Sequence, residues 1–414
     1  MNKMKKRMLL ITHGFPFGEN ERGFICEEFA ELKNAYEISI LSCGTDRLIK
    51  YSIPDLKDIQ IEQYDYKINS FMVMLQILNA DVWKEIIKAR KNCKKVLFFR
   101  RIRSILSYNY KIGVAKKEIE KIIRNTPIDL IYTYWGTEEL VAALRIKKKF
   151  CNMKVITRFH GYDLYLERQD TYWQPFQKYK AEHCDNIFFV SEAGRDYFNR
   201  EWGSEEKSEV SYLGTPCVGQ IRSSISDTLI MVSCSNLIEL KRVDLIIEAL
   251  SSLPEDIKVY WHHIGDGIES SKLQKMSMEK FLSKTNIQWK FWGYIPNKDI
   301  KKVYQDLMPH LFITTSSSEG LPVSVQEAFA MGIPAIGTDV GGMAELIKDQ
   351  KTGFLLNSNP TIKEVSDAIE KFYNMSIDKK KKMCDLAYRM WSFNFNAEKN
   401  ARYFVKAIDK ILER

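Results

Sequence analysis

Short, continuous runs of apolar residues alternate with longer amphipathic stretches along the whole chain. In the first half of the sequence, these runs cover residues 7–12, 36–43, 128–134, 154–159 and 186–191. In the second half, they cover residues 228–235, 259–265, 287–293, 311–316 and 334–338. Such runs, separated by helix-length segments, are typical of parallel strands that are buried on both faces. We therefore predict an α/β fold with two Rossmann-like domains.

A turn-rich stretch of glycine, proline and serine at 215–226 marks the expected boundary between these domains. The chain has 414 residues, more than one hydrophobic core normally supports. We assign residues 1–220 and 221–392 to the two domains. The last segment, 393–414, is expected to be a helix that caps the second domain or crosses back to the first. Ligands of open α/β sheets bind beyond the carboxyl ends of the strands, so a central cleft that both parallel sheets face is the expected site.

The clearest candidate site lies in the segment 316–342. Its pattern predicts a strand, a turn and then a helix with Pro322 in the first turn, where the missing N–H of proline is harmless. Gly320 and Leu321 then lie with Pro322 at the N-terminus of this helix. The free amides and positive dipole of such a terminus suit a phosphate or a cluster of sugar hydroxyls.

Two acids accompany this helix terminus. Glu327 falls inside the helix among apolar neighbours, where a buried carboxylate needs hydrogen-bond partners that ligand hydroxyls would supply. Glu319 lies eight positions earlier, at a distance on the order of 10 Å. The acid/base pair of a glycosidase needs roughly 5 to 9.5 Å, so the two acids suit the ends of an elongated ligand instead. The alternative is a surface acid followed by a buried acid with internal partners.

The Glu-x7-Glu spacing of Glu319 and Glu327, with GLP after the first acid and GIPAIGTDVGGMAELI behind the second, resembles a known signature. It is similar to that of the retaining glycosyltransferases of the GT-B type, called glycosyl transferases group 1, which serve bacterial capsule, exopolysaccharide and lipopolysaccharide synthesis. The resemblance covers nearly the whole second domain and pieces of the first. It implies acceptor binding by residues 1–220 and donor binding by residues 221–392. It also implies that Glu319 holds the donor sugar near the reacting carbon, as a catalytic residue, and that Glu327 grips the ribose.

The segment VSCSNLIELKRVDLIIEAL at 232–250 resembles the part of that family which binds the donor diphosphate through an Arg and, five positions on, a Lys. Lys241 matches the Lys, but Asn236 stands where the Arg is usual. Arg242, Asn236 as a neutral donor, or a group of the first domain therefore has to help neutralise the diphosphate. The alternative for Lys241 and Arg242 is a solvated pair of charges before a helix.

Two other segments of the second domain also resemble the family. FWGYIP at 291–296 is similar to the loop that reads the nucleobase, which implies that Tyr294 lies beside the base. HIGDGIESSKL at 263–273 is similar to a GDG turn, interpreted as a structural helix start. The adjacent His262 and His263 point to opposite faces of a strand and do not predict a metal site. The resemblance likewise implies that no metal and no cofactor are needed.

In the first domain, His160 directly follows the predicted strand 154–159, at the carboxyl end where site residues belong. It is part of an H-G-x-D element that resembles the family, which implies a catalytic role next to the donor sugar. Asp163 is expected to orient the local turn. Gly18, in the loop HGFPFGENERGF, is interpreted as a donor-binding position where the backbone approaches phosphate.

The formal net charge of +9 is unevenly distributed, because residues 71–124 contain 14 Lys or Arg against 4 Asp or Glu. Within it, the segment 84–124 predicts one or two basic amphipathic helices suited to an anionic membrane surface. A domain helix with a solvated basic face is the alternative. A nucleic-acid partner is not expected, because no recognised binding motif accompanies the cations. The cations proposed to touch lipid are Lys94, Lys95, Arg100, Arg101 and Arg103.

No apolar run approaches the roughly 20 residues needed to span a bilayer, and no cleavage pattern follows the brief apolar stretch near the N-terminus. The eight cysteines form no CxxC pair, so neither a zinc ribbon nor a disulfide framework is predicted. The expected location is the cytoplasm, with attachment to the inner face of the plasma membrane if the basic segment binds lipid.

Taken with the resemblance, these features predict a retaining, metal-independent glycosyltransferase that acts in bacterial surface glycan synthesis. Its partners would be a nucleotide diphosphate sugar carrying a hexose or N-acetylhexosamine, with UDP favoured and GDP-mannose as the other donor considered, and a glycan or lipid-linked acceptor. A nucleotide-sugar epimerase of the same fold is an alternative, whereas a phosphorylase would need a cofactor lysine context that is not seen. A non-catalytic subunit that binds nucleotide sugars is the third hypothesis, which the departure at Asn236 keeps open.

Overall fold

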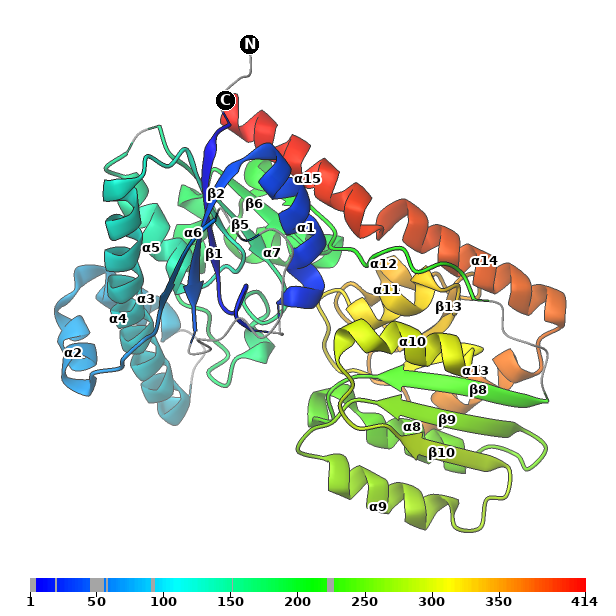
Figure 1. Ribbon diagram of the computed structural model, residues 1–414. Coiled ribbons are helices and arrows are strands. Elements are labelled where there is room, and N and C mark those ends of the chain that lie inside the picture. The colour runs from blue at the N-terminus through cyan, green and yellow to red at the C-terminus, as the bar shows by residue number, and fades with distance from the viewer. Residues whose placement is uncertain are drawn as a thin grey trace. The chain divides into compact units, whose positions relative to one another are not determined.

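The computed structural model describes residues 5–18, 21–44, 56, 59–90, 94–150, 152–221 and 227–414. The chain forms two compact units, the first made of Met1–Ser211 and Ala401–Arg414 and the second of Tyr212–Asn400 (Figure 1). The last helix, α15 (Ala397–Leu412), therefore contributes most of its length to the first unit.

The first unit contains a sheet of seven parallel strands in the order β3-β2-β1-β4-β5-β6-β7. Its strands are β1 (Arg7–Thr12), β2 (Glu37–Cys43), β3 (Gln60–Tyr64), β4 (Leu130–Thr133), β5 (Lys154–Phe159), β6 (Asn186–Phe189) and β7 (Ser208–Val210). Its helices are α1 (Arg22–Ala35), α2 (Ser70–Met74), α3 (Ala80–Ala89), α4 (Lys95–Asn125), α5 (Glu138–Lys147), α6 (Gln177–His183), α7 (Glu192–Trp202) and α15.

Both faces of the first sheet are buried, as its continuous apolar strands require. Side chains alternate along β1, so Leu9 and Ile11 join a core with α4 and α5, while Met8 and Leu10 join another with α1 and α15. Figure 1 shows these helices on opposite faces of the sheet. The carboxyl ends of all seven strands consequently lie at one edge.

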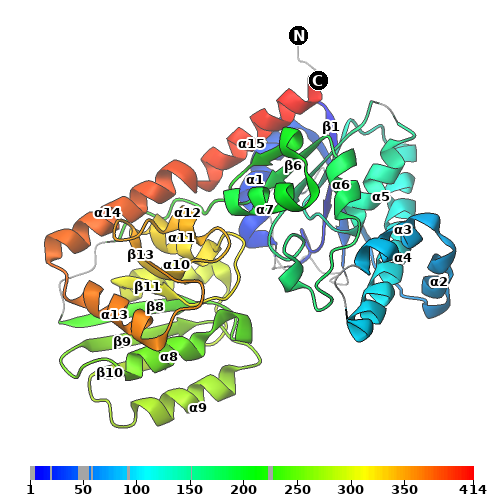
Figure 2. The same cartoon turned by 180° about the vertical axis from the view of Figure 1, so that it is seen from behind.

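The second unit contains a sheet of six parallel strands in the order β10-β9-β8-β11-β12-β13. Its strands are β8 (Thr228–Cys234), β9 (Lys258–Ile264), β10 (Ile287–Phe291), β11 (Leu311–Thr314), β12 (Ala335–Thr338) and β13 (Gly353–Leu356). Its helices are α8 (Val243–Ser251), α9 (Ser270–Phe281), α10 (Asn297–Leu307), α11 (Val323–Ala330), α12 (Met343–Leu346), α13 (Ile362–Tyr373) and α14 (Ile377–Asn394). Figure 2 shows α8 and α13 against one face of this sheet, where they form its main core with α9.

Candidate functional site

The candidate site of the second unit lies where the strand order reverses. β8 is followed along the chain by β9 on one side, whereas β11 lies on the other side of β8. Loops that leave two such strands diverge, and ligands of open α/β sheets bind in the crevice between them. The loop after β8 carries Asn236, Lys241 and Arg242, and the loop after β11 carries Glu319 and its neighbours.

These two loops meet through an ion pair between Lys241 and Glu319. The Lys241 ammonium donates to the Glu319 carboxylate over 2.5 Å, and the side chains are only 21% and 10% exposed. The backbone amide of Ser317 also donates to the carbonyl of Leu240 over 2.8 Å. Two residues predicted separately, one for the diphosphate and one for the sugar, thus form a single charged pair at the switch point of the sheet.

Glycine at 341 is required for this arrangement. Gly341 has a left-handed backbone with φ of 55°, and a Cβ atom there would lie 1.8 Å from the carbonyl oxygen of Glu319. The next amide, that of Gly342, donates to the carbonyl of Gly320 over 2.7 Å. The loop after β12 therefore packs directly against the residues that precede α11, and this close approach requires the glycine at position 341.

Helix α11 starts one residue later than predicted, because Pro322 adopts an extended conformation just before it. Gly320, Leu321 and Pro322 therefore lie at the N-terminus of the helix, as expected, but Pro322 precedes the first turn and is not part of it. Inside the helix, Glu327 accepts a hydrogen bond from the side-chain amide of Asn297 over 2.9 Å. Burial raises the pKa of Glu327 to about 7, and the hydrogen bond from Asn297 opposes this only in part.

Arg242 has a structural role that the sequence did not reveal. Its guanidinium donates to the backbone carbonyls of Thr315, Ser316 and Ser358 and to the side chain of Asn359, over 2.6 to 3.0 Å. These contacts fix the loop after β11 to the loop after β13. Most of the N–H donors of Arg242 are thus engaged inside the protein, so its predicted role as a diphosphate ligand has little geometric support.

We expect Arg242→Lys to lower the free energy of unfolding by about 2–4 kcal/mol, because it breaks several hydrogen bonds from a charged group to backbone carbonyls of two loops. Chemical denaturation would measure the loss. Arg389→Lys on α14 is the matched control, since Arg389 is exposed, and should change stability by less than about 0.5 kcal/mol. Unchanged stability with weaker diphosphate binding would instead support the donor-binding role.

The other predicted donor residues of the second unit lie at the same edge of the sheet. Asn236 is exposed in the loop after β8, and Tyr294, which is 63% exposed, follows β10. The GDG turn supports the first of these loops, because a Cβ atom on Gly265 or Gly267 would collide with backbone carbonyls of residues 235–237. These close contacts agree with the prediction that the GDG turn has a structural role.

His160 in the first unit follows β5, and its turn is held by Asp163. The Asp163 carboxylate accepts hydrogen bonds from the backbone amides of His160 and Gly136, over 2.9 and 2.7 Å. Both imidazole nitrogens of His160 are buried and have no partner among the described residues. Burial, followed by the charges of Arg158 and His13, lowers the pKa of His160 well below its usual value. A neutral imidazole with two unsatisfied nitrogens suits a sugar hydroxyl, which can both donate and accept.

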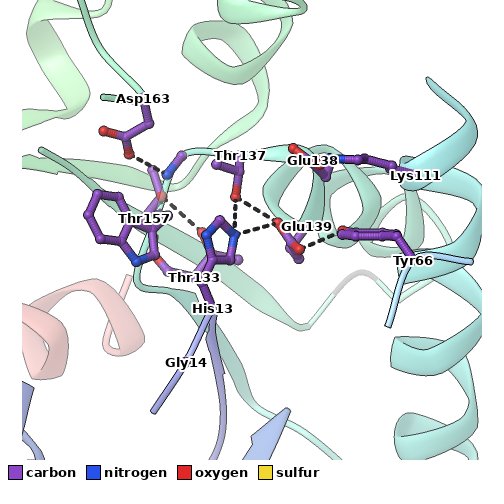
Figure 3. Close-up of polar contacts among 12 residues, drawn as sticks. His13, Gly14, Tyr66, Lys111, Thr133, Thr137, Glu138, Glu139, Thr157 and Asp163 are labelled. Carbon is purple, nitrogen blue, oxygen red and sulfur yellow. Dashed lines mark hydrogen bonds and ion pairs between the residues drawn. The ribbon is translucent and has the colours of Figure 1, made fainter. Parts of the chain in front are cut away.

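The loop that carries Gly18 is closed by its own backbone, because the amide of Gly18 donates to the carbonyl of Gly14 over 2.7 Å. The same loop contains His13, which the sequence analysis missed. The His13 ring contacts Thr137, which directly precedes α5, and Glu139 in the first turn of α5 (Figure 3). Its position directly after β1 could have identified it, because site residues belong at the carboxyl ends of strands. His160 was predicted from the same position after β5.

The histidines of β9 do not converge on one point. His262 contacts the indole of Trp292, whereas His263 contacts the hydroxyl of Ser233 on a neighbouring strand. Within the described ranges, no group of three His, Cys, Asp or Glu side chains is arranged to hold a metal ion. The independence from metal remains a prediction.

The basic segment 84–124 divides into two parts with different environments. Helix α4 is a core helix from Ile105 onward, because Ile112, Ala115 and Ile119 lie in the main core of the first unit. Residues 91–93 lie outside the described residues. The exposed basic surface is formed by Lys84, Lys88, Arg90, Lys94, Lys95, Arg100 and Arg103.

Arg101 does not belong to this surface. Its side chain is buried, and the guanidinium donates to the backbone carbonyls of Ala89, Thr171 and Tyr172 over 2.9 to 3.0 Å. The prediction that it contacts lipid is therefore wrong. Sequence periodicity could not show this, because the carbonyl partners come from α3 and from a loop that lies some 70 residues away.

Residues 220–390 match the family described as "Glycosyl transferases group 1". The second unit is a glycosyl transferases group 1 domain. The sequence resemblance that rested on Glu319 and Glu327 is thereby confirmed. A relative of this chain named as a colanic acid biosynthesis glycosyltransferase, WcaL of Salmonella typhimurium, is 25% identical over 239 residues. The aligned region covers 56% of this chain and 58% of that relative, which is less than two thirds of its length.

Solved structures resemble the whole chain. The alignment with a glycosyltransferase from Rickettsia africae ESF-5 covers 99% of this chain and 99% of that chain, with a TM-score of 0.71 and 18% identity. Anabaena Alr3699/HepE in complex with UDP has a TM-score of 0.66 and 16% identity, over 98% of this chain and 100% of that one. At these identities the likeness shows the fold alone. The predicted GT-B class, with two Rossmann-like units that each contain a parallel sheet, is confirmed.

Proposed function

We propose that this protein is a retaining glycosyltransferase that moves a sugar from a nucleotide diphosphate donor to an acceptor in bacterial surface glycan synthesis. The observation that carries the proposal is the Lys241–Glu319 ion pair at the switch point of the group 1 domain. A cation that lies 2.5 Å from a carboxylate can neutralise a leaving diphosphate while the carboxylate holds hydroxyls of the sugar beside it.

In the proposed reaction, the acceptor hydroxyl attacks the donor sugar on the same face from which the nucleotide leaves. The bond between the anomeric carbon and the diphosphate oxygen breaks, and the acceptor oxygen bonds to the same carbon. The departing diphosphate takes the proton of the acceptor hydroxyl. Lys241 stabilises the negative charge that develops on the diphosphate, and the neutral imidazole of His160 contacts a sugar hydroxyl. In this proposal Glu319 binds sugar hydroxyls and is no nucleophile, and no metal takes part.

A UDP-sugar with a hexose or N-acetylhexosamine is the favoured donor, and GDP-mannose is the second candidate. The structural neighbour HepE, whose crystal structure holds UDP, supports UDP. The acceptor would be a glycan or a lipid-linked saccharide, in keeping with the colanic acid function named for WcaL. A protein that binds nucleotide sugars without turnover is the alternative, and the exposed Asn236 in place of a second cation keeps it open.

A screen of nucleotide diphosphate sugars by thermal unfolding, followed by transfer assays with the stabilising donors, tests the proposal. A ligand at 100 times its dissociation constant adds roughly 2.7 kcal/mol to the stability of the protein. UDP should stabilise more than GDP. Stabilisation without sugar transfer or donor hydrolysis would favour the non-catalytic alternative, and no stabilisation by any nucleotide would refute the site.

Glu327 gives the donor site a pH dependence. Ribose hydroxyls donate hydrogen bonds to an ionised carboxylate. Because the pKa of Glu327 is raised to about 7, this ionised form predominates only above pH 7. At pH 6 about one molecule in ten carries the ionised form, and UDP should bind about tenfold more weakly than at pH 8. Calorimetric titration at both values would show this. Glu327→Gln should remove the dependence, and equal affinities at the two pH values in the wild type would contradict the ribose assignment.

We also propose that the first unit docks on an anionic membrane, which would place the enzyme at the inner face of the plasma membrane. Large apolar side chains stand exposed around the basic surface, with Leu78 80% and Val96 76% exposed. Phe71, Met74, Ile87 and Phe99 are exposed as well. Exposed apolar side chains next to cations are typical of interfacial membrane contacts. Every helix in the described part of the chain is too short or too polar to cross a bilayer.

A further inference from the structure

The first unit has its own switch point, and it also holds a cation–carboxylate pair. The strand order reverses between β1 and β4, which are parallel neighbours, so the loops after them leave the same edge of the sheet. His13 is the first residue after β1, and Thr137 and Glu139 follow β4. Figure 3 shows the three side chains joined by polar contacts. This is the position in an open α/β sheet where ligands bind.

Glu139 is held as a carboxylate by three hydroxyl donors. Its side chain is only 2% exposed. The hydroxyls of Tyr64 and Tyr66 donate to Oε1 over 2.9 and 2.5 Å, and that of Thr137 donates to Oε2 over 2.6 Å. Donors directed at a carboxyl group favour its charged form. Burial would raise the pKa of Glu139, but the charge of His13 and these hydrogen bonds outweigh burial and keep the pKa well below its usual value.

The contacts also fix where the protons of His13 lie. Nε2 is 3.0 Å from Oγ1 of Thr137 and 3.3 Å from Oε2 of Glu139. The Thr137 hydroxyl gives its only proton to Glu139, and the carboxylate can only accept, so Nε2 of His13 must carry a proton. The His13 side chain is 40% exposed, whereas that of Glu139 is buried. No described residue is a partner of Nδ1, so this second nitrogen remains for a ligand.

Hydrogen bonds to Glu21 hold the backbone that carries the His13 ring. The carboxylate of Glu21, which is 3% exposed, accepts the backbone amides of His13, Gly14 and Phe15 over 2.7 to 3.0 Å. It also accepts the indole N–H of Trp135. The Trp135 ring stacks on His13 from one side, with centroids 6.0 Å apart. Such a preorganised group needs little rearrangement when it binds a charge.

The surrounding charges support a cationic ring. Burial lowers the pKa of His13, but the charge and hydrogen bond of Glu139, and then the charges of Glu21 and Glu138, raise it to about 9. Lys111 lies 2.7 Å from Glu138 and pairs with that carboxyl. The other titratable groups around this cluster are Cys43, Tyr64, Tyr66 and His160.

We propose that His13 is an anion-binding residue, which holds a phosphoryl oxygen of the bound substrate through Nδ1–H while Glu139 acts as its positioning residue. An imidazolium that already gives Nε2–H to Glu139 cannot accept a proton, so it serves as an electrostatic anchor and no general base. This inference rests on the proposed function, because a nucleoside diphosphate or a phosphate-bearing acceptor supplies the anion.

His13→Gln tests the anchor, since it removes the charge and keeps hydrogen-bonding groups. Loss of a charge-assisted hydrogen bond should weaken binding about 10- to 100-fold. A larger dissociation constant for UDP assigns the phosphoryl group to the donor. Normal UDP binding with a raised KM for the acceptor assigns it to the acceptor, and no change in either value overturns the proposal. His183→Gln on α6 is the matched control, because that ring stacks on Tyr179 and is remote in sequence from this loop.

The charge of His13 is measurable without any activity. In an NMR titration of the wild type, the His13 ring should titrate near pH 9, and binding of inorganic pyrophosphate should weaken above that pH. Glu139→Gln removes the main cause of the raised pKa, so both transitions should move to lower pH. A wild-type ring that titrates at or below pH 6.5 would overturn the anchor, even if sugar transfer is observed. Absence of transfer with a ring that titrates near pH 9 would refute only the proposed function.

Discussion

Glu319→Gln and Lys241→Met should each lower turnover by about 10²- to 10⁴-fold, because each removes one member of the charged pair at the switch point of the group 1 domain. Lys241→Met should also weaken UDP binding about 10- to 100-fold, since it removes the cation that faces the diphosphate. Steady-state rates and calorimetric titration would separate the two effects. For Glu319→Gln, the main loss is expected in kcat, as the carboxylate holds the sugar during transfer.

The two residues contact each other, so their effects should not add. The double variant is expected to lose much less activity than the product of the two single losses. Lys280→Met is the matched control, because Lys280 forms a 2.8 Å pair with Glu248 on the surface of the same unit. This control should keep wild-type turnover. Retention of more than half of the activity by both single variants would refute the site.

Replacing Lys94, Lys95, Arg100 and Arg103 with glutamine should release the protein from vesicles of anionic lipid. Each cation near such a surface contributes about 1 kcal/mol, so the loss of four could lower the partition coefficient by up to about 10³-fold. Vesicle sedimentation at physiological salt would measure it. Replacing Phe71, Met74 and Leu78 with serine should also weaken binding, and this loss should persist at high salt, because apolar burial is not screened.

The matched control for the charge variant removes cations elsewhere. Lys379, Lys381 and Lys382 are exposed on α14, and their replacement with glutamine should leave vesicle binding intact. Arg101 is left unchanged in all these variants, because its loss would break buried contacts to three carbonyls. If the charge variant binds anionic vesicles as the wild type does, the surface is only a solvated basic face.

Most of the sheet strands were predictable, and the exceptions have one cause. The apolar runs at 7–12 and 228–235 coincide with β1 and β8, near the centres of their sheets, where both faces are buried. The three missed strands, β3, β7 and β13, are edge strands. Each of these three strands is short or partly solvated, so its sequence lacks a long apolar run, whereas the edge strand β10 coincides with the predicted run at 287–293.

The candidate site of the second unit was predictable in its parts. Local spacing located Glu319 before a helix and Lys241 after a strand, and both positions are confirmed. That they form one ion pair was not predictable, because the two residues are 78 positions apart. Local spacing also could not show that Arg242 and Arg101, which look like surface cations, donate to backbone carbonyls of distant loops.

The sequence by itself determined the alternation of strands and helices, the helix N-terminus at Pro322 and the residue types that follow each strand. These features depend on contacts between residues near one another in the chain, which periodicity and turn chemistry record. Only the tertiary structure decided which loops meet. His13 and Glu139, 126 positions apart, face each other because β1 and β4 are neighbours in the sheet. Strand order arises from the packing of the whole unit, and no local pattern in the sequence carries it.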